Sequence, residues 1–125
     1  MRVLLIDDEE MVRKIVRKML ERSGHEVTVA ENGRLGLEQL KTGTFDLVIT
    51  DIIMPEMEGV ETLMMVREQH PDVKVIAMSG GGRTGNIDFL STAEKLGASA
   101  ILRKPFSLGS LTAAIETTFS GAKAS

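Results

Sequence analysis

An alternation between two kinds of segment constrains the fold of this chain more than any other feature. Five short runs of apolar residues, bounded by turn-forming residues, recur at 3–6, 27–30, 47–50, 73–78 and 100–102. Continuous apolarity over such lengths, without a polar residue at every second place, is typical of strands that are covered on both faces. We therefore predict five buried strands.

The segments between these runs have the period of an α-helix. In the first segment apolar residues return every three or four positions, and basic residues occupy the other side of the predicted helix. The apolar set is Val12, Ile15, Val16, Met19 and Leu20, and the basic set is Arg13, Lys14, Arg17, Lys18 and Arg22. Ser23 and Gly24 then end this helix. Similar periods at 35–40, 60–67, 87–93 and 108–119 predict four more helices.

This order of elements predicts an α/β fold built on one doubly wound parallel sheet. Right-handed crossovers between parallel strands place helices on both faces of such a sheet. A chain of 125 residues has the size of a single domain. We expect residues 1–120 to form it and residues 121–125 to be a tail or the start of a linker. Sheets of this kind bind ligands at the carboxyl ends of their strands.

The composition argues against several classes of function. A formal net charge of -3 and 3% aromatic residues disfavour direct binding of nucleic acid. The absence of cysteine excludes disulfides and thiolate metal sites. No apolar run is long enough to span a bilayer and no signal-peptide pattern opens the sequence, so we expect a cytoplasmic protein with no membrane partner.

Chemically active side chains follow four of the predicted strands. Asp7 and Asp8 follow the first strand, and Asp51, Ser79 and Lys104 follow the third, fourth and fifth. The carboxyl ends of parallel strands meet at one edge of the sheet, so we expect these groups to converge. Carboxylates about 4 Å apart repel by roughly 4 kcal/mol at an effective dielectric constant near 20, so three of them need a compensating cation. Oxygen ligands without His or Cys favour Mg²⁺.

A magnesium site that also holds a free carboxylate, a hydroxyl and a lysine indicates phosphoryl transfer. The cation and the lysine neutralise charge on the transferring oxygens, and an aspartate can act as the nucleophile and form an acyl phosphate.

These residues resemble the receiver domains of bacterial two-component response regulators, including the single-domain chemotaxis type. The markers are Asp7-Asp8, Asp51 within DIIMPEMEG, Ser79 and Lys104-Pro105, in the order and on the strand ends of that family. The resemblance extends over essentially the whole chain. It implies a doubly wound (βα)5 flavodoxin-like sandwich with strand order 2-1-3-4-5.

The resemblance also implies a role for each residue of the site. Asp51 would accept a phosphoryl group from a sensor histidine kinase or a phosphotransfer protein. Asp8 and Asp51 would bind Mg²⁺ directly, Asp7 mainly through a water molecule, and the main-chain carbonyl of Ile53 would complete the protein ligands. Lys104 would pair with the phosphoryl oxygens, and the hydroxyl of Ser79 would move towards them.

Phosphorylation would then act as a switch. It adds about 1.5 to 2 negative charges beside the acids, which draws hydroxyl and ammonium donors inward. The changed surface would be read by a downstream effector protein or domain, and the resemblance leaves open a phosphorylation-dependent homodimer. The domain would assist its own phosphorylation and dephosphorylation but would not be a metabolic enzyme. Part of the first helix is a candidate docking surface for the kinase.

Two features depart from the family pattern. The family commonly has an aromatic residue three places before the lysine, where this chain has Ile101, so coupling through an aromatic side chain is not expected. Gly80, Gly81 and Gly82 directly follow the hydroxyl residue and make that loop permissive, so we expect the loop itself to carry the conformational change.

Several alternative interpretations compete with this one. Asp7 and Asp8 could simply cap the first helix, which would leave Asp51 and Lys104 unexplained. The G-x-G-x-x-G spacing of Gly80, Gly82 and Gly85 suggests a dinucleotide site, but it lies in the fourth unit of the fold and not in the first. A phosphatase of the haloacid dehalogenase type needs D-x-D on the first strand, whereas in this chain Asp7 and Asp8 are adjacent and Asp51 follows the third strand. A pseudo-receiver that binds partners without phosphorylation would keep the fold and lose the chemistry.

Overall fold

The computed structural model describes residues 1–52, 59–79, 95, 97–104 and 106–120, and for Val60 and Ser79 it describes the backbone alone. The elements follow one another as β1 (Arg2–Ile6), α1 (Glu10–Arg22), β2 (Glu26–Ala30), α2 (Gly33–Thr42), β3 (Leu47–Asp51), α3 (Gly59–Gln69), β4 (Lys74–Ser79), β5 (Ala100–Arg103) and α5 (Leu108–Ser120). The helix predicted around residues 87–93 lies outside the described residues, as does the glycine loop that follows Ser79.

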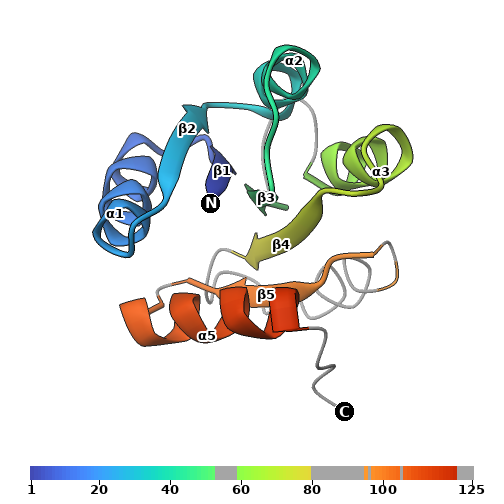
Figure 1. Ribbon diagram of the computed structural model, residues 1–125. Helices are drawn as coiled ribbons and strands as arrows, with labels where there is room; N and C mark the ends of the chain where they lie inside the picture. The colour runs from blue at the N-terminus through green and yellow to red at the C-terminus, as the bar shows by residue number, and fades with distance from the viewer. Residues whose placement is uncertain (53–58, 80–94, 96, 105, 121–125) are drawn as a thin grey trace.

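The five strands form one sheet with the order β2-β1-β3-β4-β5, which confirms the predicted fold (Figure 1). All four pairs of neighbouring strands are parallel. The observed strands begin or end within one residue of the predicted ones. The prediction for the fourth strand started one residue early, because the backbone N–H of Val73 donates to the carbonyl of His70 in the preceding turn.

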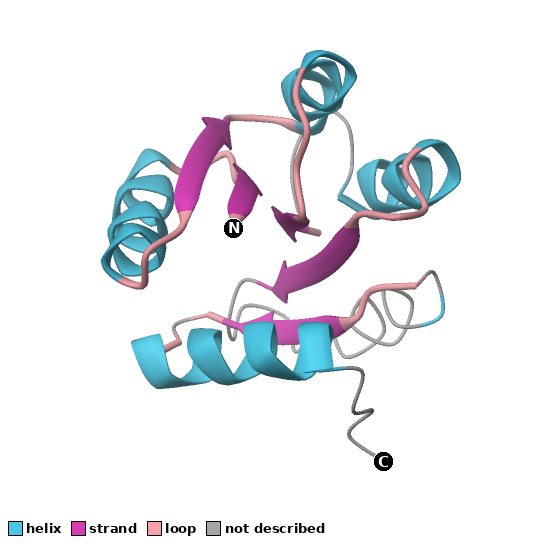
Figure 2. Ribbon diagram, in the orientation of Figure 1, coloured by secondary structure: helices cyan, strands magenta, loops and turns pink. Residues whose placement is uncertain are grey.

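Helices cover both faces of the sheet. Figures 1 and 2 show α2 and α3 on one side and α1 and α5 on the other. Two buried apolar clusters fill the space between the layers. The first joins the sheet to α2 and α3 through Leu37, Leu40, Leu63 and Val66. The second joins it to α1 and α5 through Val16, Leu20, Leu111 and Ile115.

The prediction that all five strands are buried on both faces is correct for the central strands and wrong for the two edge strands. Every residue of β3 is buried, and so is every residue of β1 after Arg2. In β2 only Ala30 is buried, and in β5 only Leu102. The reason is topological, because a strand at the edge of the sheet has a neighbour on one side only.

Helix α1 is amphipathic as predicted, but two of its residues lie differently. Val16 and Leu20 face the core with 3% and 1% exposure, whereas Ile15, predicted on the same stripe, is 50% exposed. The apolar stripe is therefore narrower than the sequence pattern suggests. Arg13, predicted on the solvent side, is half-buried, because its guanidinium turns back towards the end of β1.

The helix ends have identifiable causes. The side chain of Asn32 accepts a hydrogen bond from the backbone N–H of Leu35 and so caps α2. After α1, Gly24 adopts a φ of 90°, in the left-handed region that glycine occupies without strain. Among the helices that the structure describes, none is long and apolar enough to cross a membrane.

Candidate functional site

The alternation of side chains along the strands brings predicted site residues to the same corner of the sheet. Successive residues of a strand point to opposite faces. Val3 and Leu5 of β1 and Leu47 and Ile49 of β3 pack on the side of α1 and α5. Asp7 and Asp51 continue these two series. They therefore meet on that side, at the carboxyl edge of the two central strands, which pair directly with each other.

Asp7 is fully buried and held at every polar group. Its backbone N–H donates to the carbonyl of Ala30 at the end of β2. Its Oδ1 accepts from the backbone N–H of Glu9 over 2.9 Å, and its Oδ2 accepts from Nζ of Lys104 over 2.7 Å. Its own carbonyl accepts from Nη1 of Arg13 over 2.8 Å. Asp7 is thus a fixed part of the scaffold, since turning it would break several bonds together.

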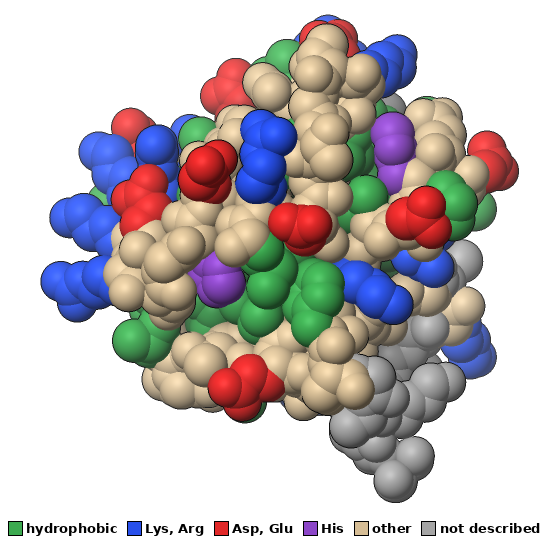
Figure 3. Space-filling model, in the orientation of Figure 1, with side chains coloured by type: hydrophobic (Ala, Val, Ile, Leu, Met, Phe, Trp, Pro, Cys, Tyr) green, Lys and Arg blue, Asp and Glu red, His purple; other side chains and the backbone are tan. Residues whose placement is uncertain are grey.

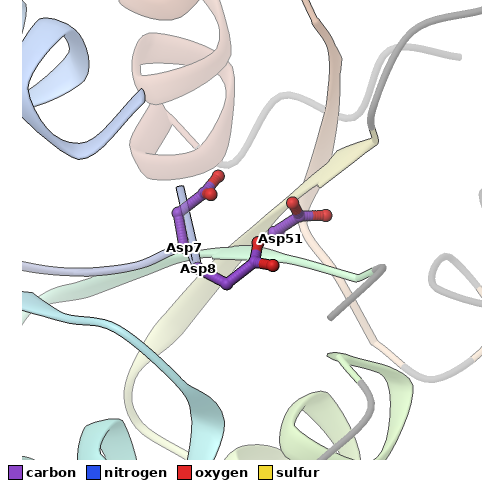
Figure 4. A group of neighbouring side chains, drawn as sticks. All are labelled: Asp7, Asp8 and Asp51. Carbon is purple, nitrogen blue, oxygen red and sulfur yellow. The ribbon is translucent and has the colours of Figure 1, made fainter. Parts of the chain in front are cut away.

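Three carboxylates converge at this edge. Asp7, Asp8 and Asp51 each offer an oxygen, and these oxygens lie within 4.8 Å of one another. Figure 4 shows Asp7 and Asp8 at the end of one strand with the side chain of Asp51 beside them. Asp7 and Asp51 are buried, whereas Asp8 is exposed. The group therefore opens to solvent on the side of Asp8.

Lys104 connects the first and last strands of the site. Its Nζ donates to Asp7 and, over 2.8 Å, to Oδ2 of Asp51, and Oε1 of Glu9 lies 3.7 Å away. The side chain of Lys104 is 12% exposed. Burial by itself lowers the pKa of this ammonium group. The hydrogen bonds to Asp51 and Asp7 and the charges of both carboxylates outweigh burial, so the pKa of Lys104 lies above its ordinary value of 10.5.

The carboxylate oxygens of Asp7, Asp8 and Asp51 are suitable ligands for a hard divalent cation. With all groups ionised, three carboxylates and one ammonium leave a formal charge of -2 at the site. One divalent cation cancels that charge. Carboxylate oxygens near an exposed side, where water completes the coordination, are the ligands that Mg²⁺ takes in proteins.

The alternative interpretation, in which Asp7 and Asp8 only cap α1, is insufficient, because the side chain of Asp7 contacts Lys104 as well as the start of α1.

The remaining predicted site residues are described only in part. Ser79 is the last residue of β4 and directly follows Met78, which pairs with Asp51 in the sheet, but the side chain of Ser79 is outside the described part of the structure. Ile53 also lies outside the described residues. Ile101 is half-buried and packs against the cluster under α2 and α3, on the face of β5 opposite to Leu102.

Sequence reasoning missed two residues of the site. The backbone N–H of Glu9 donates to Oδ1 of Asp7, and the carboxylate of Glu9 lies 3.7 Å from Nζ of Lys104. Arg13 binds the carbonyl of Asp7. The signal for Arg13 was its place one helical turn after the acids. A long cation there can reach back over the start of the helix.

The exposed face of α1 next to this edge combines apolar and basic side chains. Met11 is 68% exposed and lies one helical turn before Ile15. Figure 3 shows Lys and Arg side chains gathered over α1. The exposed basic residues of this helix are Lys14, Arg17, Lys18 and Arg22.

Comparison with known proteins agrees with this geometry. Residues 3–116 match the family model described as the response regulator receiver domain. The response regulator receiver protein CpdR of Brucella abortus is 35% identical over 92% of this chain and 93% of its own length. A protein-glutamate methylesterase/protein-glutamine glutaminase of Trichodesmium erythraeum is 37% identical over 92% of this chain, which spans 33% of that protein. The crystal structure of a receiver domain protein from Clostridium thermocellum superposes with a TM-score of 0.87, at 32% identity over 98% of this chain and 96% of that one.

Proposed function

This chain belongs to the family of response regulator receiver domains, and from that premise we propose that Asp51 is the phosphoacceptor of a two-component signalling pathway. Receiver domains interact with histidine kinases and with effectors, and the family is not in itself a family of catalytic enzymes. The donor here would be a sensor histidine kinase or a phosphotransfer protein. The result of the reaction would be a changed surface for an effector protein or domain.

The observation that carries this proposal is the convergence of Asp51 with three partners from distant parts of the chain. Lys104 lies 53 residues after Asp51 and 97 residues after Asp7, yet its ammonium binds both. An ordinary strand-end aspartate has no need of two further carboxylates and a buried lysine. A carboxylate that must accept a dianionic group does need a nearby cation, because the product concentrates negative charge.

Receiver domains generally bind Mg²⁺ at their aspartate cluster, and we assign the same role to this one. Asp8 and Asp51 would bind the ion directly, together with the carbonyl of Ile53. Asp7 would act through water, because both of its carboxylate oxygens already accept hydrogen bonds. When bound, Mg²⁺ would neutralise charge on the phosphoryl oxygens.

The reaction would be a direct displacement at phosphorus. A carboxylate oxygen of Asp51 forms the new O–P bond while the N–P bond of the donor phosphohistidine breaks, and the electron pair of that bond returns to the imidazole. Lys104 is already within hydrogen-bond distance of Asp51 and would pair with an oxygen of the transferred group. The hydroxyl of Ser79 would then be drawn towards the phosphoryl group.

The exposed face of α1 supports a role in docking the donor. Met11 and Ile15 are large apolar side chains that the fold leaves exposed on α1, the helix that begins two residues after Asp8, and exposed basic residues lie on the same helix. An amphipathic helix of a phosphohistidine-bearing domain, with acidic residues at its margin, would fit this face.

The test is mass spectrometry of the protein after incubation with acetyl phosphate, with and without Mg²⁺. We expect one phosphoryl group per chain, dependent on Mg²⁺ and absent from Asp51→Asn. Asp72→Asn, which removes an exposed carboxylate from the turn before β4, is the matched control and should label normally. Labelling that persists in Asp51→Asn would refute the assignment. No labelling of the wild-type protein would favour the pseudo-receiver, which binds partners without phosphorylation.

A further inference from the structure

Arg13 makes a contact that the proposed phosphoryl transfer does not use. It lies in the first turn of α1, where its backbone N–H donates to the carbonyl of Glu9 over 3.0 Å. The neighbouring basic side chains are exposed to solvent, whereas that of Arg13 is half-buried. It folds back along the start of the helix, and Nη1 donates to the carbonyl of Asp7 over 2.8 Å. This length is typical of a hydrogen bond with a charged donor.

The accepting oxygen belongs to the peptide unit that joins Asp7 to Asp8. Because a peptide unit is planar, the direction of its carbonyl fixes the direction of its N–H and of the bond that leads into Asp8. On the other side, Asp7 is immobilised by Ala30, Glu9 and Lys104. The contact with Arg13 is therefore the one described bond that holds the Asp7–Asp8 peptide unit by its oxygen.

Asp8 depends on this restraint more than its two neighbours do. Asp7 is buried and hydrogen-bonded through both carboxylate oxygens, and Asp51 is buried and bound by Lys104. Asp8 is exposed at the rim of the site. Packing and hydrogen bonds orient the carboxylates of Asp7 and Asp51, so the orientation of the Asp8 carboxylate must depend on its backbone.

From these contacts we propose that Arg13 is a positioning residue of the cation site, acting through the Asp7–Asp8 peptide unit to aim the carboxylate of Asp8 at Asp51. The proposal rests on the assignment of this cluster as a Mg²⁺ site. Arg13 touches neither the ion nor the phosphoryl group. Its effect should therefore appear in the affinity for Mg²⁺ and not in the chemical step.

The test is isothermal titration of the unphosphorylated protein with MgCl₂. Replacing a residue that orients a metal ligand typically costs 10- to 100-fold in affinity, and because Asp8 is one ligand among several we expect Arg13→Gln to weaken binding about tenfold. Arg13→Lys keeps the charge but has a shorter reach, and should lose about threefold. Arg17→Gln removes the same charge from the same helix at an exposed position paired with Glu21, and should bind Mg²⁺ like the wild type.

Two further measurements separate positioning from a merely structural role. At saturating Mg²⁺ the rate of labelling by acetyl phosphate should return to within about twofold of wild type in Arg13→Gln, because the chemical groups are intact. Thermal unfolding without Mg²⁺ reports any loss of stability separately.

Wild-type affinity for Mg²⁺ in Arg13→Gln would overturn the proposal, and so would an equal loss in Arg17→Gln, which would indicate an effect of charge alone. If Arg13→Gln does not fold, Arg13→Lys decides, and an unchanged dissociation constant overturns the proposal. A wild-type protein that binds no Mg²⁺ would end both this inference and the assignment of the cation site.

Discussion

Lys104 and Asp51 are 53 residues apart in the sequence, yet Nζ of Lys104 donates a hydrogen bond to Oδ2 of Asp51 over 2.8 Å. The same nitrogen binds Asp7, so one ammonium group compensates two buried carboxylates from β3 and the end of β1. This arrangement would link the stability of the domain to the proposed phosphoryl transfer, because Asp51, the proposed phosphoacceptor, is bound by the same lysine that connects the ends of β1, β3 and β5.

Replacing Lys104 should therefore destabilise the folded protein. In Lys104→Met the carboxylates of Asp7 and Asp51 keep their charges but lose this cation. Removing one partner of a buried ion pair costs about 3 to 5 kcal/mol, and we expect a loss of about 3 kcal/mol in the free energy of unfolding. Urea denaturation in EDTA measures it. Lys14→Met, at an exposed position on α1, is the control and should change stability by less than about 0.5 kcal/mol. Equal stability of Lys104→Met and wild type would contradict the ion pair.

The raised pKa of Lys104 predicts a loss of stability at alkaline pH. Because its folded pKa is above the unfolded value of 10.5, the folded state holds this proton more tightly. The stabilisation is complete below pH 10.5 and is lost as the pH rises through the folded pKa. We expect the free energy of unfolding to fall more steeply above pH 10.5 in the wild type than in Lys104→Met. Parallel pH profiles would show that Lys104 is not responsible.

Mg²⁺ should stabilise the wild-type protein, and Asp8 should be required for this effect. Binding to the folded state alone raises the unfolding temperature progressively with ion concentration, and EDTA reverses it. Asp8→Asn should respond to Mg²⁺ weakly. Without Mg²⁺ the same variant should unfold at a higher temperature than wild type, because one of three mutually repelling carboxylates is gone. A variant that is less stable than wild type in EDTA would argue against repulsion at this site.

Ile15 and Val16 should separate donor docking from stability. Val16 is buried, so Val16→Ala should cost roughly 2 kcal/mol, whereas Ile15→Ala should cost less than about 1 kcal/mol because half of the side chain is already exposed. Ile15→Ala should slow phosphoryl transfer from a phosphohistidine-bearing domain and leave labelling by acetyl phosphate unchanged. If both donors are slowed equally, α1 is not the docking surface.

Two glycine substitutions should have opposite signs. Gly24 has a φ of 90°, and a Cβ added there would meet no atom within 4 Å, so Gly24→Ala should cost about 1 kcal/mol through backbone strain alone. Gly109 lies in the first turn of α5, where a Cβ would meet only Oγ of Ser107 at 3.7 Å, so Gly109→Ala should stabilise the protein by up to about 1 kcal/mol. Thermal unfolding of the two variants compares them directly. Stabilisation by Gly24→Ala would be inconsistent with the left-handed turn.

Much of the fold followed from local pattern. The continuous apolar runs located every strand to within one residue, and the helical periods located α1, α2, α3 and α5. The errors were about exposure. The edge strands β2 and β5 are half-covered, and Ile15 is exposed, because burial depends on which element lies opposite and not on the residue type.

The site was predictable at the level of residue types and strand ends. Asp7, Asp8, Asp51 and Lys104 come together because parallel strands end at a common edge. The hydrogen-bond partners of each residue were not predictable. Asp7 accepts from the backbone N–H of Glu9 before α1 and from the ammonium of Lys104 after β5, and no spacing in the sequence specifies these contacts.

The amino-acid sequence by itself determined the order of strands and helices and the residues that leave each strand, because hydrophobic periodicity is a local property of the chain. Tertiary structure alone decided that Asp7 is an anchored scaffold residue, that Asp8 stays exposed, and that Arg13 turns from the solvent side of α1 to the Asp7 carbonyl. These outcomes depend on distances between elements that become neighbours only in the folded protein. The guanidinium of Arg13 then donates to the carbonyl of Asp7, a residue whose burial would otherwise leave that oxygen without a described hydrogen bond.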